Sequence, residues 1–174
     1  MQDIELPVTR LSRAIDGVIR VVGRGASWLW LVLMVVIVMN VGLRYLFGEG
    51  RVEFEEIQWH LNALAFLVAI VYAHSVDVHI RIDVLANRFA PRTQVWVELY
   101  GTLLLLLPFV VMVFVFSLPF VAHSWALNET SQSPGGLPFR WLIKGVLPGI
   151  FVMLMLCMLA RVSRLWAYLK APAP

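Results

Sequence analysis

Four long apolar stretches dominate the pattern of hydrophobic and polar positions along the chain. They cover approximately residues 27–46, 57–73, 95–116 and 141–160. A helix that crosses a bilayer needs about 20 mostly apolar residues. Because lipid offers the backbone no hydrogen bonds, such stretches cross it as helices and not as open strands. The pattern therefore predicts an all-α integral membrane protein, with four transmembrane helices in a single membrane domain over residues 1–174.

Two further segments have the spacing of amphipathic helices that lie at the membrane surface. In the first, at about 9–24, one helical face is apolar and the opposite face is mainly basic. The apolar positions are Leu11, Ile15, Val18 and Val22, and the opposite ones are Arg13, Asp16, Arg20 and Arg24. Anionic lipid attracts a helix of this kind. The arm at about 77–90 repeats the apolar spacing. Its residues 78–82 also alternate as in a strand, but the edge of a lone strand would leave backbone hydrogen bonds unsatisfied, so we expect a helix.

Composition and the distribution of charge fit a membrane protein. The chain is 60% hydrophobic and 14% charged, whereas ordinary soluble domains are about 45–50% apolar and about 25% charged. Ten Lys and Arg residues lie on the side that holds both termini, and four lie on the other. The positive-inside rule therefore predicts that both termini are cytoplasmic. The net charge of +3 is too small to indicate a nucleic-acid partner.

The most informative polar residues open the second predicted span. They are Arg51, Glu53, Glu55, Glu56, Gln58, His60 and Asn62. Glu55, Gln58 and Asn62 share one helical face, and polar groups near lipid tend to face protein. One interpretation is that this face docks a partner. The other is a helix cap, because carboxylates favour the positive end of a helix dipole; the sequence leaves both open.

Two asparagines predict a contact between the first two spans. Asn40 lies about six residues from the outer end of its span, and Asn62 about five from the start of the next, so both are expected roughly 8–9 Å deep. We expect these two side chains to hydrogen-bond across the helices. Arg44, near the outer interface, is expected to pair with Glu55 or Glu56.

The sequence contains no recognisable catalytic, cofactor-binding or metal-binding arrangement. It has no nucleophile beside a base, no phosphate loop and no pair of carboxylates near the membrane midplane. The four histidines lack ligand spacing, so we expect no metal, no cofactor and no enzymatic activity. Two other classes stay open: a haem- or quinone-binding membrane anchor of a respiratory complex, and a small channel or carrier that works alone.

The order of several short motifs resembles a known family. Leu43-Arg44-Tyr45-Leu46-Phe47 ends the first span, Glu55-Glu56 opens the second, and His79-Ile80-Arg81-Ile82-Asp83 follows it. The outer loop around Gly135, Gly136 and Pro138 is the most specific part. Together they resemble the small, DctQ-like membrane subunit of tripartite ATP-independent periplasmic (TRAP) transporters, in the branch associated with mannitol, chloroaromatic or 2-oxo acid uptake. Glu53-Phe54 departs from the Trp-Ser found in many relatives.

The resemblance implies a non-catalytic, multi-pass subunit of the bacterial inner membrane, whose partners include membrane lipid. It would brace a large M-type subunit and help to dock a periplasmic substrate-binding protein, during sodium-coupled uptake of an organic anion. The candidate contact residues are Arg44, Arg51, Glu53, Glu55, Glu56, Gln58, Asn62, Gly135, Gly136, Pro138, Arg140 and Lys144.

Overall fold

The computed structural model describes residues 6–76 and 89–171. This part of the chain is helical, without strands. Its elements are α1 (Arg10–Phe47), α2 (Val52–Ser75), α4 (Pro91–Gly101), the π-helical turn η1 (Thr102–Leu106), α5 (Leu107–Ala126) and α6 (Arg140–Lys170). Because α4, η1 and α5 follow one another without a break, four helices are long and apolar enough to cross a membrane. The prediction of an all-α protein with four spans is confirmed.

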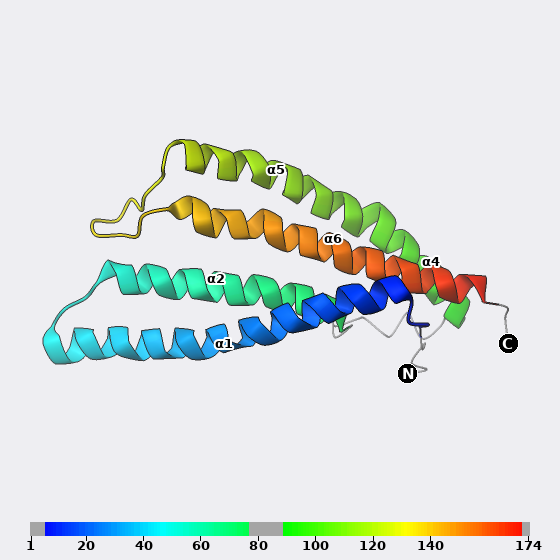
Figure 1. Cartoon of the computed structure of the whole chain (residues 1–174), viewed down its shortest axis with the longest axis horizontal. Coiled ribbons are helices and arrows are strands. Elements are labelled where there is room, and N and C mark those ends of the chain that lie inside the picture. Colours follow the sequence, from blue (N-terminus) through cyan, green and yellow to red (C-terminus); the bar gives the residue numbers. More distant parts are fainter. Residues whose placement is uncertain (1–5, 77–88, 172–174) are drawn as a thin grey trace.

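The helices form two antiparallel hairpins that lie side by side (Figure 1). One hairpin is α1 with α2 and the other is α5 with α6, and α6 also contacts α1, α2 and α4. Both chain ends lie at one end of the molecule, which we call the terminal end (Figure 1). The connections 48–51 and 127–139 lie at the opposite end, which we call the loop end.

Charged residues border an apolar zone at both of its ends on α1 and α6. No charged residue lies between Arg24 and Arg44 on α1, or between Lys144 and Arg161 on α6. The interval on α1 measures about 30 Å at 1.5 Å per residue, which matches the roughly 30 Å thickness of a hydrocarbon core. Most large apolar side chains in this zone face outward, such as Leu105 at 75% exposure. The bilayer, and not a protein core, is the environment that this surface fits.

α1 is longer than a span, because it runs without interruption from Arg10 to Phe47. The predicted surface segment at 9–24 and the predicted span at 27–46 are therefore parts of one helix, which extends about 21 Å beyond Arg24. Ile19, 2% exposed, packs in a buried cluster with residues of α2 and α6. Val18 is 61% exposed, so the apolar positions of this segment divide between two faces. The arm expected at 77–90 lies almost wholly outside the described residues.

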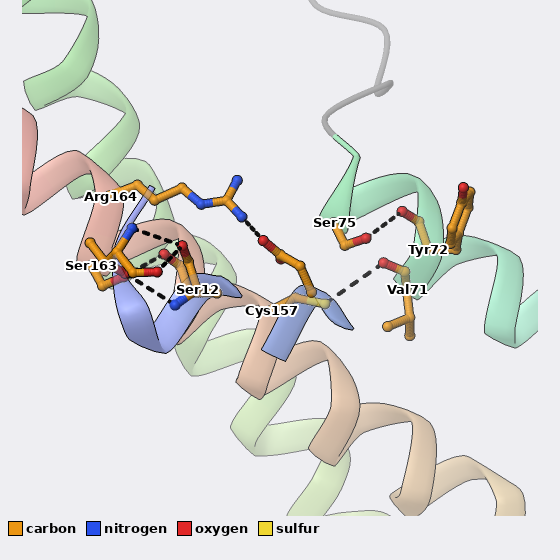
Figure 2. Close-up of polar contacts among 10 residues, drawn as sticks. Ser12, Val71, Tyr72, Ser75, Cys157, Ser163 and Arg164 are labelled. Carbon is orange, nitrogen blue, oxygen red and sulfur yellow. Dashed lines mark hydrogen bonds and ion pairs between the residues drawn. The ribbon is translucent and has the colours of Figure 1, made fainter. Parts of the chain in front are cut away.

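Polar contacts join the extended part of α1 to α6 at the terminal end. Arg164 forms an ion pair with Asp16, and the Thr9 and Ser163 hydroxyls are 2.8 Å apart. Figure 2 shows this region, with Ser163 beside Ser12 and the Cys157 sulfur directed at the Val71 carbonyl. Arg161 pairs with Glu98 of α4 at 2.5 Å. These pairs lie at or beyond the charged border, where water lowers the free energy required to hold ions.

The third span contains a local irregularity. The π-helical turn Thr102–Leu106 comes just before Pro108. Proline has no N–H to donate to the preceding turn, and π-turns commonly absorb such a break inside an α-helix. The four spans therefore keep continuous helical backbone through the apolar zone.

Candidate partner-docking site

Two residues in left-handed conformation lie at the ends of the loop between α5 and α6. Asn128 has φ 44° and Phe139 has φ 61°. Asparagine tolerates this region, but a bulky residue such as phenylalanine rarely adopts it. Such conformations cost about 1–3 kcal/mol each and persist only where surrounding contacts impose them. The loop is therefore held in one shape by its contacts.

The principal contact joins the loop to the first turns of α2. The Ser131 hydroxyl donates to one oxygen of the Glu56 carboxylate, and the Leu137 N–H donates to the other at 2.7 Å. Within the loop, the Ser131 N–H donates to the Leu137 carbonyl at 3.1 Å. One carboxylate therefore holds both sides of the loop. We call Glu56 with Ser131 and Leu137 the loop clamp.

Gly136 is required for the loop clamp to close. A Cβ at this position would lie 2.5 Å from the Ser131 hydroxyl and 2.8 Å from the Glu56 carboxylate. Gly135, with φ 78°, supplies the left-handed turn that precedes it. A Cβ there would lie 3.8 Å from a Glu53 carboxylate oxygen. The two glycines thus allow the loop backbone to approach the acidic start of α2.

Glu129 connects the loop to the start of α6. Its carboxylate pairs with the Lys144 ammonium and lies 3.8 Å from the Arg140 guanidinium, and its carbonyl accepts the Arg140 N–H at 3.0 Å. The hydrogen bond from Lys144, with the nearby charge of Arg140, holds the pKa of Glu129 below its ordinary value of 4.5. Glu129 is therefore an anion at neutral pH.

Aromatic rings surround this charged group. The Trp125 and Trp141 rings meet edge to face at 4.2 Å, and the Lys144 ammonium lies 4.2 Å from the centre of the Phe120 ring. Trp125 and Phe139 are 61% and 50% exposed. Exposed aromatic residues are typical both of the membrane interface and of protein contact surfaces.

Arg44 and Arg51 pair with different partners. Arg44 contacts Glu55 at 2.5 Å, which is one of the two partners that the sequence left open. Arg51, at the N-cap of α2, lies 3.5 Å from Glu49 in the connection between the helices. Both pairs are substantially exposed, so each adds at most about 1 kcal/mol to stability.

The predicted hydrogen bond between Asn40 and Asn62 is absent. Asn40 is 8% exposed, and its Oδ1 has no hydrogen-bond partner within the described residues, whereas Asn62 is exposed. In the antiparallel hairpin, where Arg44 pairs with Glu55 and Gly23 lies against Tyr72, Asn62 lies deeper in the apolar zone than Asn40. The Gln58 Nε2 is also buried without a partner in this part of the chain.

The structure thus divides the sequence-predicted residues. Glu53 and Glu56 lie beside Gly135 and Gly136. Arg140 and Lys144 form a separate group around Glu129. Pro138 and Asn62 are exposed. The sequence did not single out Ser131 or Glu129, although both belong to the outer loop that carries the family resemblance. A signal for Glu129 exists in retrospect, because two cations, Arg140 and Lys144, follow it on one helical face.

The described residues contain no group of three or more His, Cys, Asp or Glu side chains placed to hold a metal ion. His60 is half-buried on α2 and His123 is exposed on α5.

Comparison with known proteins gives one finding. The family model for tripartite ATP-independent periplasmic transporters, DctQ component, matches residues 33–167. No curated protein matches the chain. The match covers the whole of the second and third spans and parts of the first and fourth, and it includes the loop clamp. The chain therefore belongs to the DctQ family, and is the small membrane subunit of a tripartite ATP-independent periplasmic transporter.

Proposed function

We propose that this chain is a non-catalytic subunit that braces the large membrane subunit of its transporter in the bacterial inner membrane. Its loop end faces the periplasm and forms part of the surface on which the substrate-binding protein docks. The large subunit and the binding protein carry out substrate recognition and sodium coupling, and the transported substrate is an organic anion.

The observation that carries this proposal is the loop clamp. It makes a rigid, polar surface from two segments that are far apart in sequence, at the end of the molecule away from both termini. Glycine, serine and carboxylate groups lie there beside exposed aromatic residues. A preformed surface of this kind binds a partner with little loss of conformational entropy.

The apolar zone supports an accessory role. Between the charged borders, α1, α2, α5 and α6 have no Asp, Glu, Lys or Arg. Transport sites use polar or ionisable groups near the midplane, or broken helices whose ends face the substrate. The chain is suited to contact the large subunit along its apolar faces, and no observation favours the haem or quinone anchor.

The docking role is tested by Glu56→Ala in the reconstituted transporter. Glu49→Ala is the matched control, since Glu49 is an exposed acid at the same end with only a weak pair. Binding of the purified substrate-binding protein to the membrane complex is measured by surface plasmon resonance. We expect Glu56→Ala to weaken this binding by about tenfold or more, as loss of a contact worth more than 1 kcal/mol would, and Glu49→Ala to leave it unchanged. Equal binding by both variants would contradict the docking role.

Bracing of the large subunit and coupling of uptake to sodium need separate measurements. The large subunit expressed without this chain should be recovered at lower yield and melt at lower temperature. Uptake is then measured in vesicles with all three components, for the organic anion that most stabilises the binding protein. An inward sodium gradient should drive uptake. Uptake by this chain alone would show instead that it carries substrate by itself.

A further inference from the structure

A second surface feature lies in the apolar zone, on the side nearer the terminal end and away from the loop clamp. It is a groove of about 290 Å³ between α1 and α2. Its walls come mainly from small side chains, with one large aromatic ring on each helix. They include Gly23, Ser27 and Trp30 of α1, and Ala65, Ala69 and Tyr72 of α2.

The groove exists because a close contact between the two helices is followed by small side chains. A Cβ on Gly23 would lie 2.5 Å from the Tyr72 ring, so the backbone of α1 rests on that ring. Deeper in the apolar zone, Ala65 and Ala69 are too short to fill the space opposite Trp30. Ala69 is exposed and Trp30 is 45% exposed, so the groove opens to the lipid.

The depth of the groove places it where a lipid changes from polar to apolar. Arg24 marks the charged border of α1 and also lines the groove. Trp30 lies six residues further, which is about 9 Å into the apolar zone. The Arg20 side chain, one turn before Arg24, is exposed. The Arg24 side chain therefore lies at the mouth with apolar walls below it, and Arg20 lies one turn further along the same helix.

The charge at the mouth of the groove indicates the kind of occupant. Basic pockets between transmembrane helices are suited to anionic lipid headgroups.

We infer that this groove binds an anionic phospholipid, with the phosphate on Arg20 and Arg24 and one acyl chain along Trp30 and Ala69. The inference is independent of the docking role, because the groove and the loop clamp share no residue. It assigns a specific lipid contact to the α1–α2 hairpin.

The test uses quenching of Trp30 by brominated lipid. The full-length chain is reconstituted in phosphatidylcholine vesicles with a minor fraction of phosphatidylglycerol, and bromine is placed on the acyl chains of one lipid or the other. The signal of Trp30 is the difference between the native chain and Trp30→Phe. We expect phosphatidylglycerol to quench Trp30 more than its fraction predicts, by about fivefold for each arginine, since a basic residue near the membrane surface contributes about 1 kcal/mol.

Four variants separate the groove from general surface charge. Arg24→Gln should lower the enrichment about fivefold, whereas Arg13→Gln, an exposed arginine about 16 Å away along α1, should leave it unchanged. Ala69→Phe fills the groove and keeps both arginines, so it should abolish the enrichment; Ala122→Phe, at an exposed position of α5, is its control.

Three results would overturn the inference. The first is quenching by the two lipids in proportion to their amounts. The second is enrichment that survives Ala69→Phe, because the lipid would then lie only on surface charges. The third is loss of the enrichment in the complex with the large subunit, which would show that a helix of that subunit covers the groove.

Discussion

Gly136 is the position where a single methyl group most affects the loop. Gly136→Ala would place a Cβ 2.8 Å from the Glu56 carboxylate, so the loop or α2 must move. We expect a loss of about 1–3 kcal/mol, as for other overpacked sites, measured as a lower melting temperature in detergent. The control is Gly145→Ala on α6, where the Cβ has open space and the helix should gain about 0.5–1 kcal/mol. Equal melting of Gly136→Ala and the native chain would contradict the contact.

Glu129 gives the loop a dependence on pH. Its pKa in the folded protein is lower than the ordinary value of 4.5. The ion pair with Lys144 therefore contributes its full stability above pH 4.5, and that stability is lost as the pH falls through the lowered pKa. We expect pepsin to cleave the 127–139 loop increasingly faster as the pH falls below 4.5. Glu129→Gln removes the titrating group, so cleavage of that variant should lack this added pH dependence.

Asn40 of α1 buries an acceptor and Gln58 of α2 buries a donor, each without a partner in the described chain. A single buried water could bridge them, because such waters bind otherwise unsatisfied polar groups. We expect Asn40→Leu and Gln58→Leu to be destabilising singly, by about 1 kcal/mol each, and nearly neutral together. Melting of the three variants in a double-mutant cycle measures the coupling. Additive losses would show that the two amides act separately.

At the scale of elements, the sequence predicted the spans well and their ends poorly. The apolar run of 57–73 became α2 (Val52–Ser75), and 141–160 became α6 (Arg140–Lys170). Hydropathy marks only the part of a helix that lies in lipid, whereas the backbone continues wherever contacts support it. The extension of α1 depends on the Thr9 capping box and on Asp16 pairing with Arg164, which lies 148 residues away in sequence.

Substitution of the Asp16–Arg164 ion pair tests whether it supports the extension of α1. Asp16 and Arg164 side chains are each 16% exposed, so Asp16→Asn leaves a largely buried guanidinium without its counterion. We expect a loss of about 3 kcal/mol and a lower melting temperature. Arg13→Gln, one turn away and exposed, should have little effect. Exchange of the two charges, Asp16→Arg with Arg164→Asp, should recover part of the loss; no recovery would show that the pair itself is not responsible.

At the scale of the whole molecule, the sequence predicted which segments form the candidate site but not that they contact each other. The acidic start of α2 and the Gly-Gly loop stand out in the sequence as separate segments. Their contact depends on how α6 packs against the α1–α2 hairpin, which periodicity within one helix does not determine. For the same reason the expected Asn40–Asn62 contact is absent, since it assumed equal depth for two residues that the packing of α1 against α2 places at different depths.

The orientation of the molecule decides which end the periplasmic partner can reach. Lys and Arg residues are concentrated at the terminal end, and the positive-inside rule then places the loop end in the periplasm. Cys157 is buried and is the one cysteine of the chain, so Cys157→Ala provides a background for single-cysteine labelling. We expect a membrane-impermeant maleimide to label Ser133→Cys in intact spheroplasts, and to label Val8→Cys only after lysis, since both positions are exposed. The opposite result would place the loop clamp in the cytoplasm, where no periplasmic binding protein could contact it.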